Sequence, residues 1–349
     1  MRLAKACYVM CSYRGLRNLF CVCVVIVFSL FLFDRFSSVS GKEFEGRSYI
    51  DLGTVAKEFG MRSGWTMNGE MYCLRTASNQ IDALIDSRCL FINEMPVSLG
   101  FRTIKARGRL YLSEDDYKKT LVPLLEMELL EADISEPYRI VLDAAHGGTD
   151  TGAVNAVYGL KEKDLSLDIC KRLKILLEAS GYQVSLTREQ DVYLPLKNRS
   201  KFANETKADL FLSIHLNAAM NKEVVGIETF VMTPVGQRST GRSLTEADDL
   251  KYFKGNDFDY SNVCFGYLLQ KTLVTHMNAT DRGLKRARFA VLKDLEMPGL
   301  LTELGFLSNS ESASRLGNEK TRQLLAEGLL EGIDSYYHFL KIRDNKNLR

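Results

Sequence analysis

The sequence predicts an α/β protein in which a mostly parallel, twisted sheet is flanked by helices and preceded by a small α+β module. Two patterns predict it: strand-like and helical stretches alternate after residue 138, whereas 46–126 holds short strand-like runs between turn residues. A length of 349 residues suggests two domains, and 46% hydrophobic with 26% charged residues is ordinary for a globular chain. The net charge of only +2 leaves no electrostatic footprint for nucleic acid, so we expect no such partner.

Residues 1–40 are typical of an export segment. Four basic residues precede an apolar run at 19–33, namely Arg2, Lys5, Arg14 and Arg17. As a helix this run rises about 22 Å, short of the roughly 30 Å hydrocarbon core of a bilayer. With small residues up to Ser40 behind it, the segment predicts a signal peptide cleaved after Ser40. The alternative is an uncleaved membrane anchor over 19–36, and both place the chain in the periplasm, the extracellular space or the cell wall.

The segment 46–126 has two similar ends around a β middle. Each end runs from a strand into a helical stretch, at 49–60 and at 111–125. Strands are expected between them over 71–75, 80–85 and 88–92. The segment has no histidine and no dense polar cluster, so we expect a binding or spacer module, followed by an acidic linker over 127–137.

The cysteines of the chain argue against a cysteine metal site. Four of the eight lie in the export segment, and those that follow it are Cys73, Cys89, Cys170 and Cys264. None of these four stands at C-x-x-C spacing with another. Cys73 and Cys89 could form a disulfide in an oxidising compartment, but the sequence leaves this pairing open because it does not give their geometry.

From residue 138 the pattern predicts a catalytic domain over 138–345. Strands are expected over 139–143, 183–187, 210–214, 227–232, 290–293 and 300–306, and helices over 162–180, 196–205, 261–277 and 321–342. Such alternation favours a mostly parallel sheet with both faces covered. In these sheets ligands bind beyond the carboxyl ends of the strands, so polar side chains near strand ends are the candidates for function.

Four side chains fall near that edge. His146 follows the first strand and precedes the paired glycines 147–148, which allow a tight turn, and His215 closes an apolar strand. Glu162 opens the first helix, and Glu303 lies inside an apolar strand. Two imidazoles and one carboxylate are the ligand count of a catalytic zinc site, which leaves one position for water. A carboxylate in an apolar strand should have a raised pKa, which suits a general acid/base that passes a proton from water to a leaving nitrogen.

Each of these residues also has a plain structural explanation. A single histidine at a strand end is usually structural, and Glu162 at a helix start is favoured by the helix dipole. The coincidence of His146 and His215 with a costly buried Glu303 favours a metal site instead.

Four other polar residues are interpreted more simply. Asp143 and Asp150 either orient the histidines or only form the turn. His276 lies inside a predicted helix and His338 lies beside two tyrosines, so both are interpreted as structural.

These segments resemble the zinc-dependent N-acetylmuramoyl-L-alanine amidases of the amidase type 3 family, over about residues 138–342. The motifs are His-Gly-Gly-x-Asp-x-Gly-Ala from 146, Glu-Lys at 162–163, Ser-Ile-His-x-Asn-Ala at 213–218 and Glu-x-Gly-Phe-Leu-Ser-Asn at 303–309. Further positions that look like this family are 186–188, Asp191, Arg199, 203–204, 226–230, 281–284 and 289–292. The resemblance implies zinc on His146, Glu162 and His215, with Glu303 catalytic. It also implies hydrolysis of the amide between the lactyl group of N-acetylmuramic acid and L-alanine of the peptidoglycan stem peptide.

Two alternatives stay open at this point. One is an inert peptidoglycan-binding or scaffold protein, which four intact site residues disfavour. The other is a zinc peptidase that cuts within the stem peptide, since the residues themselves do not specify the scissile bond.

The chain departs from that family in two places. Ala144-Ala145 stands where the family has Pro-Gly, so we expect a shifted turn with the histidine ligand kept. The stretch 236–260 is longer than in short members and is either a solvated loop or a mobile flap that restrains activity until an activator protein moves it. The module at 46–126 resembles the small N-terminal domain of copper amine oxidases, without a set of copper ligands.

Overall fold

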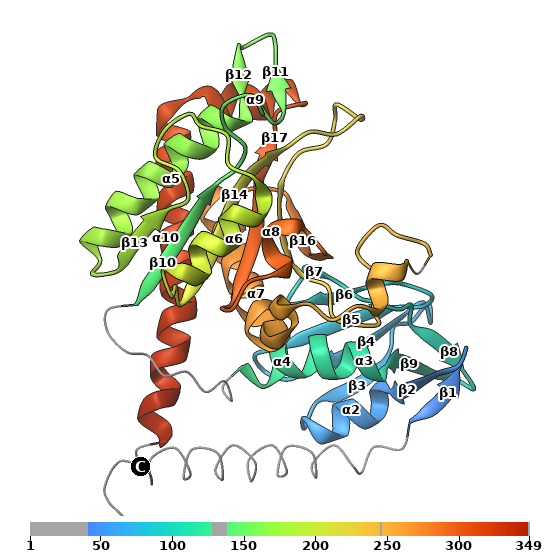
Figure 1. Cartoon of the computed structure of the whole chain (residues 1–349). Helices are drawn as coiled ribbons and strands as arrows, with labels where there is room; N and C mark the ends of the chain where they lie inside the picture. The colour runs from blue at the N-terminus through green and yellow to red at the C-terminus, as the bar shows by residue number, and fades with distance from the viewer. Residues whose placement is uncertain (1–40, 128–137, 245, 348–349) are drawn as a thin grey trace, which may run out of the picture.

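The computed structural model describes residues 41–127, 138–244 and 246–347 (Figure 1). The predicted signal peptide or anchor over 1–40 and nearly all of the predicted linker over 127–137 lie outside the described residues. Within the described part of the chain, no helix combines the length and the apolar character that crossing a membrane requires.

A large twisted sheet organises the described residues and confirms the predicted α/β fold class (Figure 1). Its strands run in the order β13-β10-β14-β17-β15-β16-β7-β6-β5-β4-β3. The strands after residue 138 are β10 (Arg139–Ala144), β13 (Gln183–Leu186), β14 (Leu210–Asn217), β15 (Ile227–Met232), β16 (Asp281–Ala287) and β17 (Gly299–Phe306). Strands β13, β10, β14 and β17 are parallel to one another, β15 is antiparallel to β17, and β16 is parallel to β15.

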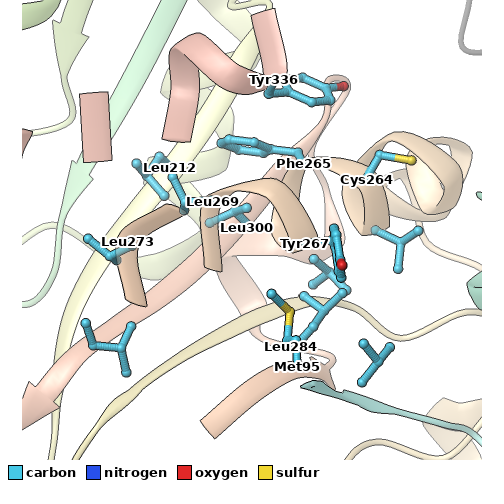
Figure 2. Close-up of a cluster of buried hydrophobic side chains, with 14 of the residues drawn as sticks. Met95, Leu212, Cys264, Phe265, Tyr267, Leu269, Leu273, Leu284, Leu300 and Tyr336 are labelled. Carbon is cyan, nitrogen blue, oxygen red and sulfur yellow. The ribbon is translucent and has the colours of Figure 1, made fainter. Parts of the chain in front are cut away.

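Helices cover both faces of this half of the sheet. On one face lie α5 (Glu162–Ala179), α7 (Asp259–Met277) and α10 (Glu319–Asn347), and on the other lie α6 (Leu196–Glu205) and α8 (Ala290–Lys293). Successive side chains of β10 point to opposite faces of the sheet, which explains the two helical layers. Ile140 and Leu142 join the core under α5, whereas Val141 joins the core under α6 and α8. Figure 2 shows the first core, where Leu212 and Leu300 of the sheet face Phe265 of α7.

One predicted element is wrong. Residues 290–293 form the helix α8, and the strand of this region is β16, which lies a few residues earlier. Three apolar residues followed by a lysine do not distinguish a strand from a helical turn, and α8 packs against α6 as a helix.

The N-terminal part, predicted as a small α+β module, is a unit of nine strands with short helical segments among its described residues. Its strands are β1 (Lys42–Phe44), β2 (Arg47–Asp51), β3 (Arg62–Trp65), β4 (Met71–Arg75), β5 (Gln80–Leu84), β6 (Cys89–Ile92), β7 (Met95–Ser98), β8 (Ile104–Ala106) and β9 (Arg109–Ser113). Its helical segments are α2 (Leu52–Glu58), α3 (Glu114–Asp116), the π-helical turn η1 (Tyr117–Leu121) and α4 (Val122–Leu125). Asp51 caps α2 by accepting from the Gly53 N–H, which explains why the strand β2 turns directly into this helix.

The two parts of the chain share one sheet and one core. Strand β7 pairs in parallel with β16, at Val97 and Leu284. At this junction Gly283 has φ +82°, and a Cβ there would lie 2.1 Å from the Pro96 carbonyl oxygen, so the close approach requires glycine. Nearby, the buried Arg286 guanidinium donates to the Lys119 carbonyl (2.9 Å). The predicted boundaries at 46–126 and 138–345 stay predictions, and the structure adds a continuous junction between the two segments.

The geometry of the sheet excludes a disulfide between Cys73 and Cys89. Cys73 lies on β4 and Cys89 on β6, with β5 between them, so two strand spacings of roughly 4.8 Å separate their backbones. Disulfides need Cα atoms within about 7 Å. Both are free thiols, and burial raises the pKa of the Cys73 thiol to about 11.

The long segment 236–260 is anchored at its beginning. The Arg88 guanidinium of the N-terminal part donates to the carbonyls of Arg238 (2.9 Å) and Ser239 (3.2 Å). Thr240 N–H donates to the Arg286 carbonyl of β16 (2.9 Å). The segment also contains the short 3₁₀ helices η3 (Ala247–Leu250) and η4 (Lys254–Phe258). It is therefore tied to β16 and to the N-terminal part.

Candidate active site

The turn after β10 presents His146 at the carboxyl edge of the sheet. His146 has φ +58°, a left-handed conformation that costs energy for a side chain other than glycine. The next residue, Gly147, has φ +129°, and a Cβ there would lie 2.2 Å from the Val192 carbonyl oxygen. The backbone must therefore turn tightly between β10 and the loop at Val192. Ala144 and Ala145 are fully buried in this turn.

Two buried arginines hold this turn. Arg199 donates to the Asp143 carboxylate (2.8 Å) and to the carbonyls of Ala144 (2.7 Å) and His146 (2.7 Å). Arg188 donates to the carbonyls of Ala144 (2.9 Å) and Ala145 (2.8 Å). The motif resemblance marks both arginines, but only the structure gives their role, which is to satisfy the buried carbonyls of a strained turn.

The two aspartates of the turn differ. Asp143 is fully buried and accepts from Arg199, Thr187 and Ser213, so it supports the turn and contacts neither histidine. Asp150 Oδ2 lies 2.8 Å from His146 Nδ1. This contact fixes the imidazole ring and leaves Nε2 facing Glu162, which is how carboxylates usually orient a metal-binding histidine.

Glu162 connects the two histidines. It is the first residue of α5 and is 4% exposed. One carboxylate oxygen lies 2.9 Å from His215 Nδ1, and the other lies 3.1 Å from His146 Nε2. Backbone N–H groups of Leu216 and Ala153 also donate to it. Burial alone would raise the pKa of this carboxyl, but the hydrogen bonds and charges of His146 and His215 hold it well below its usual range.

The structure brings the three predicted metal ligands together. His146, Glu162 and His215 each offer one ligand atom, and these atoms lie within 4.8 Å of one another. Burial lowers the pKa of His146, but the neighbouring carboxylates of Glu162 and Asp150 outweigh it and the net pKa is raised. Two imidazoles beside an ionised carboxylate form a donor set that suits zinc, and the residues present therefore fit that ion.

Glu303 lies in the neighbouring strand. Strand β17 pairs with β14 so that Glu303 is level with His215, and on its other side β15 places Glu228 level with Glu303. Burial raises the pKa of the Glu303 carboxyl well above its usual value, and the charges of Glu162 and Glu228 raise it further, while Lys285 lowers it. Its Oε2 atom is buried without a hydrogen-bond partner among the described residues. A raised pKa at this position agrees with the sequence prediction, and the catalytic role stays a prediction.

The other two histidines lie away from this group. His276 of α7 pairs with Glu331 of α10 (3.1 Å), which is a contact between two helices. His338 lies within α10. Glu228 and Lys285 also belong to this site, and the sequence pattern did not predict them there. Glu228 carried the same signal as Glu303, an acidic residue within an apolar strand, and could have been found by it.

A sheet edge that gathers two histidines, a bridging carboxylate and a second, half-buried acid is typical of metal-dependent hydrolases. The profile of one family, described as N-acetylmuramoyl-L-alanine amidase, matches residues 140–335, which is more than half of the 349-residue chain. The chain therefore belongs to the N-acetylmuramoyl-L-alanine amidase family. The family match begins after the N-terminal part.

The chain is also similar to individual curated proteins and to solved structures. The chain is 33% identical over 222 residues to N-acetylmuramoyl-L-alanine amidase AmiA of Escherichia coli (strain K12), covering 57% of this chain and 76% of that one. It is 32% identical over 209 residues to the uncharacterized protein YqiI of Bacillus subtilis (strain 168), covering 59% and 89%. A solved structure, the N-acetylmuramoyl-L-alanine amidase of Clostridium difficile 630, matches with 32% identity and a TM-score of 0.49, covering 58% of this chain and 98% of that one.

Proposed function

We propose that this chain is a zinc-dependent N-acetylmuramoyl-L-alanine amidase that hydrolyses the amide between N-acetylmuramic acid and L-alanine of the peptidoglycan stem peptide. The observation that carries the proposal is that the ligand atoms of His146, Glu162 and His215 lie within 4.8 Å of one another, beside the half-buried Glu303. Membership of the family supports the choice of substrate and of scissile bond.

His146, Glu162 and His215 would hold the zinc ion. Bound zinc supplies Lewis acidity, which polarises a carbonyl and brings the pKa of a water molecule down to about 7. The residues around the ligands prepare the site. Asp150 orients the His146 ring, and Arg199 holds the backbone of the same turn, so the ligands need little rearrangement.

Glu303 is the general acid/base of the proposed reaction. It takes a proton from the attacking water and delivers it to the leaving nitrogen of L-alanine. A carboxyl with an ordinary pKa is too weak a base for this task at neutral pH. Burial and the neighbouring Glu228 raise the pKa of Glu303 and so match it better to the reaction.

Export and regulation are further parts of the proposal. The substrate polymer lies outside the cytoplasmic membrane, which fits the basic and apolar pattern of residues 1–40, as signal peptide or as anchor. An activator protein acting on 236–260 would reach the site through β16. The reason is that Thr240 pairs with the backbone of this strand, while Lys285 of the same strand contacts Glu228. We keep 46–126 as a binding or spacer module and 127–137 as its linker.

The test is mass spectrometry of the fragments released from purified sacculi by residues 41–349. We expect free stem peptides that begin with L-alanine, released with added zinc and abolished by a chelator. Glu303→Ala should abolish release while still binding zinc, because Glu303 is not among the ligands. Lys222→Ala, at an exposed position of the same edge, serves as the matched control and should remain active.

The other outcomes identify the alternatives. Peptides cut within the stem would replace the amidase by a zinc peptidase. Retention on sacculi without release of any fragment, in a protein that binds zinc, would favour an inert binding protein. In that case deletion of residues 238–257 distinguishes inertness from autoinhibition, because an autoinhibited enzyme would gain activity.

A further inference from the structure

A cluster of charges lies beside Glu303, and its member Arg282 has no role in the proposed hydrolysis. Glu228 of β15, 4% exposed, accepts from Arg282 Nε (2.8 Å), and its ion pair with Lys285 uses the same carboxylate oxygen. Its other oxygen accepts from Asn217 Nδ2 (3.0 Å), two residues after His215. The single carboxylate of Glu228 therefore faces two cations, and the cluster of Glu228, Arg282 and Lys285 carries a net charge of +1.

Arg282 is fixed at one end and open at the other. Its guanidinium lies over the Phe306 ring, 5.1 Å from the ring centre, and Nε is engaged with Glu228. No hydrogen bond of Nη1 or Nη2 to any of the described residues is present, and 32% of the side chain is exposed. A guanidinium anchored through Nε presents its two terminal nitrogens as a planar fork, the geometry that binds a carboxylate through both oxygens.

The register of the strands places this fork close to the scissile bond. His215, Glu303 and Glu228 are level with one another on three neighbouring strands. Strands lie roughly 4.8 Å apart, so the Glu228 backbone is about 10 Å from that of His215. An extended peptide covers about 10 Å in three residues. A peptide whose scissile amide lies at the metal ligands can therefore bring a carboxylate of one of its next three residues to Arg282.

We propose that Arg282 binds a free carboxylate of the stem peptide and thereby selects the substrate, with Glu228 as the positioning residue that holds the guanidinium. This inference rests on the proposed amidase function, because it assumes that the stem peptide extends from the site. A carboxylate neutralises the excess charge of the cluster, whereas a carboxamide at the same place offers one acceptor and no charge.

Lys285 does not take this role. It is 19% exposed and its ammonium group lies against Glu228 and 5.6 Å from the Phe230 ring centre. It balances the charge of Glu228 and, through that, the surroundings of Glu303. The aliphatic part of Arg282 packs against the backbone of Gly226, since a Cβ added to Gly226 would lie 2.9 Å from Arg282 Cγ. The stem of the arginine is therefore packed, and only its terminal nitrogens are open.

The experiment measures kcat/KM on matched pairs of synthetic muramoyl peptides. In one pair the acidic second residue of the stem carries either its free carboxylate or a carboxamide. In the other pair the carboxyl terminus of the stem is free or amidated. Wild-type protein should prefer the acid form in one of the pairs by about tenfold, mainly through KM. In Arg282→Gln the ratio of kcat/KM between the acid and amide forms should fall to about one, whatever the absolute rate.

Two further variants separate recognition from a structural effect. Arg282→Lys keeps the charge without the fork and should keep only part of the preference. Arg315→Gln, which removes an exposed arginine of the helix α9 (Ser310–Gly317), is the matched control and should keep all of it. The readout is a ratio between two substrates on one preparation, so a partly unfolded variant does not change it.

Two results would overturn the inference. One is a wild-type protein that hydrolyses both members of each pair equally. The other is an Arg282→Gln variant that retains the full preference for the acid. A wild-type protein that releases no L-alanine-terminated peptide from any substrate would instead overturn the proposed function, so the two failures are distinguishable.

Discussion

The large sheet has a mainly parallel half, formed after residue 138, and an antiparallel half formed by β3 to β7. The two halves differ in how many strand ends, and so how many side chains, meet at one edge. Strands β10, β14 and β17 are parallel, so their carboxyl ends meet, and the residues placed there by three distant segments come together. Strands β3 to β7 are antiparallel, so successive strands end at opposite edges. The antiparallel strand β15 extends the same edge because its beginning, with Glu228, adjoins the end of β17. One continuous sheet therefore gathers the candidate site residues at the edge of its parallel half, whereas its antiparallel half gathers no such group among the described residues.

The two halves also differ in how the carboxylates of Asp116 and Glu303 are hydrogen-bonded. In the N-terminal part, Asp116 is fully buried and accepts from Gly100 N–H, Phe101 N–H and the Ser113 hydroxyl. In the parallel half, Glu303 has a buried oxygen without a partner among the described residues. A satisfied buried acid stabilises a fold, whereas an unsatisfied one costs stability and is retained for chemistry.

The largest expected effect separates these two acids. Glu303→Gln should lower kcat by about 10²- to 10⁴-fold because it removes the proton acceptor, while thermal stability stays the same or rises. Asp116→Ala should do the reverse and cost about 2–4 kcal/mol, because three buried donors lose their acceptor. Denaturation midpoints and kcat per folded molecule measure both. A Glu303→Gln variant that unfolds readily and remains active would contradict the division of roles.

The junction between the halves gives the next effect. Gly283→Ala combines a positive φ with a Cβ 2.1 Å from the Pro96 carbonyl, so it should cost at least about 2 kcal/mol and loosen β7 from β16. Gly69→Ala is the matched control, since Gly69 has φ +68° but open space around its Cβ, and should cost about 1 kcal/mol. Equal losses in the two variants, measured by urea denaturation, would show that the junction is not tightly packed.

A smaller effect tests the contact between the N-terminal part and 236–260. Arg88→Ala removes the hydrogen bonds to the carbonyls of Arg238 and Ser239 and should cost about 1–2 kcal/mol. It should also expose the segment to proteolysis, so limited trypsin digestion should cut within 236–260 sooner than in the wild type. Unchanged cleavage would mean that β16 alone holds the segment.

The smallest effect lies in the helical layer of the parallel half. Burial raises the pKa of Asp168, but Arg172 and Arg322 outweigh it, so the net pKa lies below the ordinary 3.8. A lowered pKa gives stability that is present above the unfolded value and is lost as the pH falls through the folded value. Asp168→Asn should therefore lower the melting temperature at pH 7. The corresponding loss in the free energy of unfolding should be less than about 1 kcal/mol. The difference from the wild type should shrink towards pH 2, and a constant difference across this range would contradict the ion-pair explanation.

The periodicity of the sequence was enough to predict the α/β class, most strands after residue 138 and the helices that cover them. It failed at 290–293, where three apolar residues and a lysine fit a strand and a helix equally well. It also gave no sign that β7 would pair with β16, because strand pairing between distant segments depends on which edge is left open.

The sequence by itself determined which donor groups the candidate site offers. Its pattern places two histidines near strand ends, a glutamate at a helix start and a glutamate in an apolar strand, namely His146, His215, Glu162 and Glu303. Their surroundings were decided only by the tertiary structure. Arg199 beneath the His146 turn, and Glu228 with Arg282 beside Glu303, come from other strands and helices. The physical reason is that residue type and local pattern fix what a side chain can do. Its pKa, its partners and its open hydrogen-bond donors depend on neighbours that are distant in the chain.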